Sequence, residues 1–366
     1  MISKRSAYRG CLLGLAVGDA MGYSVDTKTW PQIQEDYGPN GLLGYDLVNG
    51  YADVTSHTQL AAFTCNGLLV GMTRGQIQGK MAPFVKYVAL GHKEWAIGQR
   101  RYDQPQRNFC WVFQIPELRR RHCTDTRMLD TLNRGRLGSP EEPVNRFDSP
   151  GAIAAAAAVG LFADPNRMDK EEIDRLGAEA IALTHGSPTA FLPGAVAAHL
   201  ISRLLRDQTT PLAEMIENAL AALEHQFGRE YVQVKEVCAL VRHAADLAQS
   251  RNRNQVEVME HLTCETAAEV LAGAVYASLL CEDDFDSAMI VAVNHSGRSA
   301  AVGCLVGAIL GARMGEEALP EFYMECLEPA PVLRELADDL YQGCPMEMGD
   351  TLFDGDWDRK YLHGEY

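Results

Sequence analysis

The chain has 366 residues, of which 47% are hydrophobic, and its 49 acidic and 33 basic side chains give a net charge of −16. This composition excludes a wholly disordered chain, and the acidic balance argues against a protein that binds nucleic acid through a basic face. No uncharged stretch of about 18 residues has membrane-like hydropathy and no convincing signal peptide is present, so we expect no association with a membrane.

The first predicted element is a helix over residues 7–21 with an apolar stripe along one face. Gly10, Gly14 and Gly18 recur at every fourth residue, which places them on one side of the helix and favours close packing against another helix. Asp19 lies near the C-terminal end, where a carboxylate opposes the helix dipole, so its charge requires a specific partner.

A long irregular segment precedes the second strong helix. Residues 36–53 are rich in glycine, asparagine and aspartate without periodicity, and they predict a long loop that we expect to line a site. Thr55 or Ser56 then caps a predicted helix over residues 60–72, because a hydroxyl at that position accepts hydrogen bonds from free backbone N–H groups.

Residues 74–137 show a helical pattern with interruptions. Trp95, Trp111 and Phe113 are expected in the core, whereas the basic run 119–122 is expected on a solvated face. The ten cysteines of the chain include no Cys-x-x-Cys pair, which is typical of reduced, buried thiols in a cytoplasmic protein.

Helical periodicity also dominates the rest of the chain. The ranges that it favours are 152–162, 170–183, 189–205, 212–227, 232–249, 256–262, 264–280, 285–294, 300–312 and 320–341. Because alternating strand patterns are scarce and no fixed-period repeat occurs, we predict an all-α fold with one large domain over residues 1–366. The acidic, aromatic segment 347–366 either folds back on this domain or forms a flexible tail.

A polar turn at residues 294–299 separates two apolar runs near the end of the chain. The run after it, 300–312, consists largely of small residues and predicts a tightly packed helix, so the turn would lie at a helix N-terminus, where N–H groups favour anions. The turn contains Arg298 and no acid, which does not suit a metal site. The chain has no phosphate-binding loop, dinucleotide fingerprint or H-E-x-x-H motif, and residues 294–298 lack the first glycine of a nucleophile elbow.

Four separated stretches match the motifs of one family. Residues 10–22 are similar to G-x-L-L-G-x-A-x-G-D-A-x-G, and residues 55–60 fall at the position of an S/T-D-D-T-Q-M motif. Residues 183–188 resemble a T-H-x-x-P segment, and residues 283–315 resemble a closing motif that contains N-x-G-G-D-S-D-T-I-G. The four stretches occur in the order found in the family and together span most of the chain. On these motifs the chain resembles the ADP-ribosylglycohydrolases, a family that includes the dinitrogenase reductase-activating glycohydrolase.

The resemblance implies a single domain of orthogonal helices that hydrolyses ADP-ribosyl bonds with two Mg²⁺ ions. In the family these ions are held by Thr-Asp-Asp at one helix start, by Asp-x-Asp-Thr at another and by a Glu after the opening motif. This chain retains Thr55 of that set. The other positions carry Ser56, His57, Arg298, Ala300 and Ala301, and the Glu position carries Asp26. The four carboxylates of the two motifs are thus replaced by side chains of which one, Arg298, is charged.

The charge of Arg298 bears directly on metal binding. An arginine about 5 Å from a divalent ion is repelled by roughly 6–7 kcal/mol at an effective dielectric constant near 20. The neutral side chains that remain at the first motif offer weak ligands against this repulsion. We therefore predict no dinuclear Mg²⁺ site and no other cofactor, and we expect Arg298 to occupy the metal volume, paired with Asp26 or Asp19.

Two functions are consistent with this pattern. In the first, the protein keeps the fold without the catalysis, and Arg298 holds the pyrophosphate of ADP-ribose or of another nucleotide directly, unless side chains fill the pocket entirely. In the second, the protein is an active hydrolase of ADP-ribosyl bonds that replaces the metals with Arg298. His57 or His185 would then act as the base, and Asp26 as the acid or water-positioning group.

The predicted ligand contacts come from three segments of the chain. They are Thr55, Ser56, His57, His185, Ser296, Gly297, Arg298 and Ser299. Structural roles compete with these: His57 as a helix-start residue bonded to a carbonyl, His185 as a buried residue that holds a turn, and Asp19 as a helix cap. We expect ADP-ribose or an ADP-ribosylated protein as the partner and a cytoplasmic location, and the sequence specifies no oligomeric state.

Overall fold

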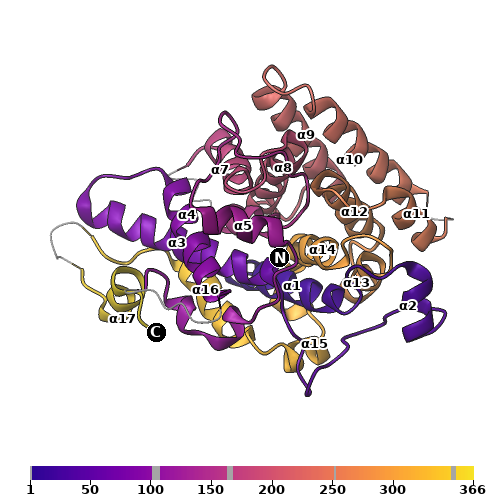
Figure 1. Cartoon of the computed structure of the whole chain (residues 1–366), viewed down its shortest axis with the longest axis horizontal. Helices are drawn as coiled ribbons and strands as arrows, with labels where there is room; N and C mark the ends of the chain where they lie inside the picture. The colour runs from indigo at the N-terminus through magenta and orange to yellow at the C-terminus, as the bar shows by residue number, and fades with distance from the viewer. Residues whose placement is uncertain (1, 101–107, 163–167, 251–252, 348–351) are drawn as a thin grey trace.

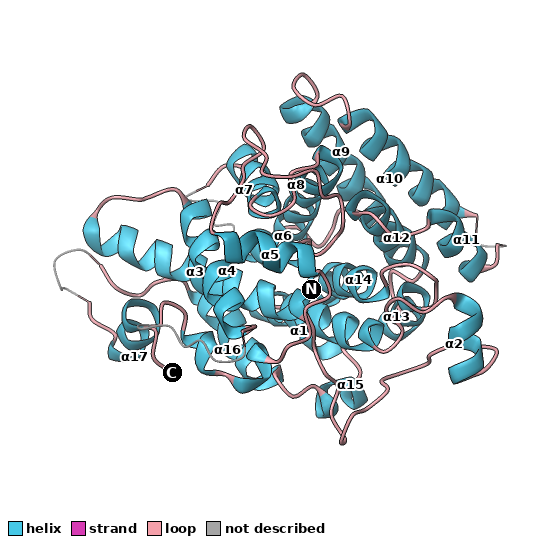
Figure 2. Cartoon of the chain, in the orientation of Figure 1, coloured by secondary structure: helices cyan, strands magenta, loops and turns pink. Residues whose placement is uncertain are grey.

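The computed structural model of the chain describes residues 2–100, 108–162, 168–250, 253–347 and 352–366. Throughout these ranges helices are joined by loops, without a β-strand beyond two isolated bridges (Figure 2), which confirms the predicted all-α fold. The α-helices are α1 (Lys4–Tyr23), α2 (Trp30–Tyr37), α3 (Ser56–Gln78), α4 (Phe84–Gly98), α5 (Thr126–Arg134), α6 (Ala154–Phe162), α7 (Lys170–Ala182), α8 (Pro188–Leu204), α9 (Leu212–Phe227), α10 (Val234–Gln249), α11 (Gln255–Leu262), α12 (Ala267–Leu280), α13 (Phe285–Val293), α14 (Ser299–Met314), α15 (Glu321–Cys326), α16 (Ala330–Gln342) and α17 (Gly355–Asp358). Short 3-10 turns η1 (Trp111–Gln114), η2 (Pro116–Arg119) and η3 (Glu316–Ala318) and a π-turn η4 (Arg359–His363) complete the secondary structure. None of the helices in the described ranges is long and apolar enough to cross a lipid bilayer.

The helix ends follow local signals in the sequence. The α9 helix covers the predicted residues 212–227, and α12 begins with a capping box in which Thr266 and Glu269 exchange hydrogen bonds with each other's backbone. Helix α2 was not predicted from the sequence, although a second capping box, between Thr29 and Gln32, marks its start. Such a short helix contributes too few apolar positions for its periodicity to be visible.

Helices α1 and α14 run antiparallel near the middle of the molecule (Figure 1) and touch along a seam of glycines. The facing pairs are Gly10 with Gly311, Gly14 with Gly307, and Gly18 with Gly303. A methyl group on Gly18 would lie 2.9 Å from the backbone nitrogen of Cys304 and closer still to the carbonyl of Gly303. The backbones therefore touch directly, as the glycine spacing predicts, and the seam places the start of α14 beside the end of α1.

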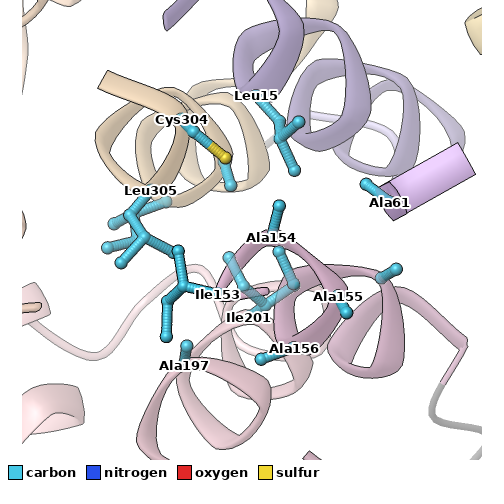
Figure 3. Packing of buried hydrophobic residues seen from close by; sticks show 14 of the residues in the cluster. Leu15, Ala61, Ile153, Ala154, Ala155, Ala156, Ala197, Ile201, Cys304 and Leu305 are labelled. Atoms are coloured by element: carbon cyan, nitrogen blue, oxygen red, sulfur yellow. The ribbon is translucent and has the colours of Figure 1, made fainter. Parts of the chain in front are cut away.

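The Ala-rich helix α6 lies at the centre of the core, and all of its residues are buried. Side chains from α1, α3, α8 and α14 surround it, as Leu15, Ala61, Ile201 and Leu305 illustrate (Figure 3). Because alanine adds little width to a helix, these four helices and α7 approach α6 closely. The result is a rigid frame for the helix starts that form the candidate site.

The described end of the C-terminal segment folds back onto the domain. Trp357 is 3% exposed and donates a hydrogen bond of 2.9 Å to Oγ1 of Thr73, and the ring of Tyr366 stacks on Trp111 with the centroids 4.9 Å apart. Trp111 is buried, as are the other two aromatic residues predicted in the core, Trp95 and Phe113.

The basic run 119–122 differs from the predicted solvated face. Nη1 of Arg120 lies 2.5 Å from a carboxylate oxygen of Asp53 and 2.6 Å from one of Glu328, while Arg121 is exposed. A single-sequence pattern cannot reveal these acids because both lie far away along the chain.

Candidate functional site

The buried carboxylate of Asp19, near the end of α1, caps the first turn of α3. Its two oxygens accept hydrogen bonds of 2.6 Å from the hydroxyls of Thr55 and Thr58 and of 2.8 and 3.0 Å from their backbone N–H groups. A carboxylate with four donors at a helix N-terminus is stabilised despite its burial. Asp19 therefore has the structural role of a helix cap, and it fixes the start of α3, where His57 lies.

A polar cleft of about 380 Å³ opens where the first turns of α3, α5 and α14 meet the turn before α6. It is lined by Asp26, His57, Thr124, Asp125, Thr126, Arg127, Ser149, Pro150, Gly151 and Arg298. Its volume falls within the range of small-molecule sites. The structure thus brings together three of the residues that the sequence singled out, namely Asp26, His57 and Arg298.

The side chain of His57 lines this cleft although it is only 2% exposed. Its Nε2 lies 3.5 Å from Oγ1 of Thr124, and its Nδ1 has no hydrogen-bond partner in the described part of the chain. The ring therefore lacks the carbonyl partner that a purely structural role would give it. A buried polar atom without a partner costs on the order of 1–3 kcal/mol, so Nδ1 is a site at which a ligand would restore a lost hydrogen bond.

Asp125 connects three of the segments around the cleft. Its Oδ1 accepts hydrogen bonds from the first backbone N–H groups of α5, and its Oδ2 accepts from the hydroxyl of Ser149 and lies 3.3 Å from Nε2 of His185. Burial favours the neutral acid, but the hydrogen bonds from His185 and Ser149 outweigh it and hold the pKa of Asp125 well below its usual range. Nδ1 of His185 lies 2.9 Å from Oγ1 of Thr184, so His185 is a fully bonded, buried residue that does not itself line the cleft.

The partner of Arg298 differs from the predicted one. The side chain extends from the N-cap position of α14, and its Nε lies 3.1 Å from a carboxylate oxygen of Glu265. The predicted ion pair with Asp26 or Asp19 is wrong, because Asp19 is engaged by α3 and Asp26 accepts a hydrogen bond of 3.2 Å from the N–H of Ala300. Arg298 is one-third exposed in the cleft wall, so it leaves the cleft open.

Two arginines and two acids lie in the walls of the cleft. Burial raises the pKa of Asp26, although the N–H of Ala300 and the charge of Arg298 act in the opposite direction. A second cation, Arg127, lies with its guanidinium 4.9 Å from the ring centroid of Phe147. The cleft therefore has two guanidinium groups in its walls, one acid whose pKa is raised by burial, and one acid that is already fully hydrogen-bonded.

The two predicted contacts at the start of α3 are bonded within the protein. Thr55 donates its hydroxyl to Asp19, and Oγ of Ser56 lies 3.0 Å from Oγ1 of Thr124. Ser56 also accepts a hydrogen bond from the backbone N–H of Thr124, so it ties α3 to the segment before α5. Both residues support the wall on which His57 and Thr124 lie.

The turn before α14 is also held by its own contacts. The N–H and hydroxyl of Ser296 donate to Glu260 at 2.6 and 2.9 Å, and Gly297 and Ser299 are hydrogen-bonded to His295. None of these three predicted residues is among those that line the cleft, although Arg298 of the same turn is, and their contact with a ligand stays a prediction. Burial lowers the pKa of His295 to about 4, which suits its structural role as a neutral ring.

One wall of the cleft, formed by Thr124, Asp125 and Arg127, was not predicted from the sequence. The local signal for it was an aspartate directly before a short amphipathic helix, which is typical of an N-cap. The long loop over residues 36–53, by contrast, was expected to line a site and contributes no residue to this cleft.

Comparison with known proteins gives three findings. The sequence profile of the family described as ADP-ribosylglycohydrolase matches residues 2–349. An uncharacterized protein of Archaeoglobus fulgidus is 25% identical over 341 residues, which cover 92% of this chain and 96% of that protein. A solved structure described as an ADP-ribosylglycohydrolase-related protein complex is 22% identical, covers 93% of this chain and 98% of its own, and superposes with a TM-score of 0.56, which shows a shared fold.

Proposed function

Since this chain belongs to the ADP-ribosylglycohydrolase family, we propose that it binds ADP-ribose or a related nucleotide in the cleft without divalent metal and hydrolyses it weakly or not at all. The observation that carries this proposal is the position of Arg298, whose side chain lines the cleft where the family motif supplies a metal-binding carboxylate. A fixed cation there repels Mg²⁺ and attracts an anionic ligand.

The side chains at the family's metal positions do not suit a pair of Mg²⁺ ions. Thr55 and Ser56 keep their hydroxyls in hydrogen bonds within the protein, and Ala300 and Ala301 have no side-chain oxygen. His57 offers nitrogen, whereas Mg²⁺ prefers oxygen ligands. In the described ranges no three His, Cys, Asp or Glu side chains are grouped so that they could hold a metal ion.

The cleft has features that favour ligand binding over an inert pocket. Its two guanidinium groups, Arg127 and Arg298, lie at the starts of α5 and α14. The unpartnered Nδ1 of His57 supplies a further polar contact from a buried position. A ligand such as ADP-ribose combines negative charge with many hydroxyl groups, and it matches this lining.

Calorimetric titration with ADP-ribose in the presence of EDTA tests the proposal, together with an assay of ADP-ribose release from an ADP-ribosylated peptide. We expect binding that EDTA does not weaken and no release above the uncatalysed background. A variant with Asp at Ser56, His57, Arg298 and Ala300 should gain Mg²⁺-dependent binding. Two Mg²⁺ ions bound per unmodified chain, or EDTA-sensitive turnover by it, would contradict the proposal.

An active, metal-independent hydrolase is the second candidate. Two observations favour it: burial raises the pKa of Asp26, as suits an acid that donates a proton, and His57 presents a free ring nitrogen to the same cleft. In this case Asp26→Asn and His57→Ala should each abolish ADP-ribose release that persists in EDTA. Absence of any such release in the unmodified protein excludes this candidate.

For the partner and the location we make two related proposals. The open cleft fits free ADP-ribose or the modified side chain of an ADP-ribosylated protein, and the acidic composition disfavours nucleic acid. The buried thiols of Cys11, Cys65 and Cys304 fit a reducing compartment such as the cytoplasm. Fluorescence microscopy of the tagged chain measures the location directly.

A further inference from the structure

The two cations in the cleft wall have unused hydrogen-bonding capacity. Glu265 engages Nε of Arg298, and Arg127 is held over the ring of Phe147 with its Nε 3.7 Å from Asp125. In the described part of the chain, neither arginine donates a hydrogen bond from its terminal Nη nitrogens. An arginine held by its Nε or its face is oriented in advance and can offer its terminal N–H groups to a second anion.

A buried group points to the same cleft independently of these cations. His57 is 2% exposed, lines the cavity, and has an Nδ1 without a partner within the described ranges. Exposed arginines alone are common on protein surfaces and prove little. A buried, unpartnered ring nitrogen in the same cavity is uncommon, and it indicates that a ligand group completes the hydrogen bonding there.

The two acids in the cleft wall do not cancel this attraction. Asp125 uses both of its oxygens, because it accepts from two backbone N–H groups, from the hydroxyl of Ser149 and from His185. Asp26 accepts a hydrogen bond from the N–H of Ala300 at the start of α14, so the helix dipole compensates part of its negative charge. The guanidinium groups are thus the polar groups of the cleft with the most unused donors.

We propose that Arg127 and Arg298, together with His57, form a subsite that binds a phosphate or pyrophosphate group directly, in the region that the family motifs assign to metal ions. The inference rests on the proposed function, because it assigns the pyrophosphate of an ADP-ribosyl ligand to these two arginines. It also makes a separate claim, since a subsite of this kind binds inorganic pyrophosphate without a sugar or a base.

The test is calorimetric titration of the full chain with inorganic pyrophosphate and with ADP-ribose, both in EDTA. The variants are Arg127→Gln and Arg298→Gln, and the matched control is Arg136→Gln, an exposed arginine that does not line the cleft. We expect each cleft variant to weaken pyrophosphate binding at least tenfold, the control to change it less than twofold, and added salt to weaken binding by the unmodified chain. Arg298→Lys should lie between, because it keeps the charge and loses the planar fork.

The outcomes separate this inference from the proposed function. Pyrophosphate binding that the cleft variants lose, without binding of ADP-ribose, supports the subsite and refutes ADP-ribose as the ligand of the proposed function. Binding of ADP-ribose that neither cleft variant weakens supports the proposed function and overturns the subsite. Binding of neither probe by the folded, unmodified chain overturns both, and pyrophosphate binding that requires Mg²⁺ overturns the subsite.

Discussion

The glycine seam between α1 and α14 makes a quantitative prediction for the variant Gly18→Ala. The added methyl group would lie 2.9 Å from the backbone nitrogen of Cys304 and closer to the carbonyl of Gly303, and neither backbone group can rotate away. The two helices must therefore separate locally by about 1 Å, which removes a quarter to a half of the dispersion energy of the atom pairs they share. With about 40 such pairs at roughly 0.15 kcal/mol each, this loss is about 2 kcal/mol, and overpacking strain adds about 1–3 kcal/mol.

Equilibrium unfolding in urea measures this effect, and we expect the free energy of unfolding to fall by about 3–5 kcal/mol. The matched control is Gly98→Ala, at the end of α4, where the nearest atoms to an added methyl group lie at 3.4 Å. This control should leave stability unchanged or raise it by up to about 1 kcal/mol, because alanine favours the helix. A loss of less than about 1 kcal/mol in the free energy of unfolding of Gly18→Ala would show that α1 and α14 can separate with little energetic penalty, which would contradict the prediction.

Three further predictions concern other buried groups and the metal. Asp19→Asn should lower the free energy of unfolding by about 3 kcal/mol in urea, because an amide cannot accept all four hydrogen bonds that cap α3; a neutral result would contradict the capping role. Burial raises the pKa of Glu94 from 4.5 to about 7, so the folded state binds its proton more tightly, and stability should fall as the pH rises through this window. Between about pH 5 and about pH 8 the loss is about 2–3 kcal/mol, and the variant Glu94→Gln should not show it; equal slopes of stability against pH for both proteins would refute the prediction. Elemental analysis of protein purified with Mg²⁺ should find well under one ion per chain.

Most of the helices could be predicted from the sequence, with α2 as an exception, because their signals are local. Apolar periodicity, capping residues and the spacing of Gly10, Gly14 and Gly18 all act within a few turns, and the observed helices and the close approach of α1 to α14 agree with them. Three members of the cleft, Asp26, His57 and Arg298, could also be predicted, because each falls within or beside a motif that the family resemblance aligns.

The partner of Arg298 could not be predicted in this way. Glu265 reaches it because the loop between α11 and α12 turns sharply at Thr263 and Cys264, which have φ values of 58° and 54°. Residues other than glycine rarely adopt this left-handed conformation, and no sequence pattern indicates it here. The carbonyl of Cys264 accepts a hydrogen bond from the N–H of Arg298, so contacts between distant segments hold the loop in place.

The pairing of α1 with α14 also constrains how the chain acquires its shape during synthesis. Gly18 meets a partner that is made about 285 residues later, so the first helix leaves the ribosome long before the surface that covers its glycine face exists. Until then that face and the Ala-rich α6 are open to incorrect contacts, which is the situation in which chaperones act. Nascent chains that end before residue 299 should therefore bind chaperones, and extension through α14 should release them.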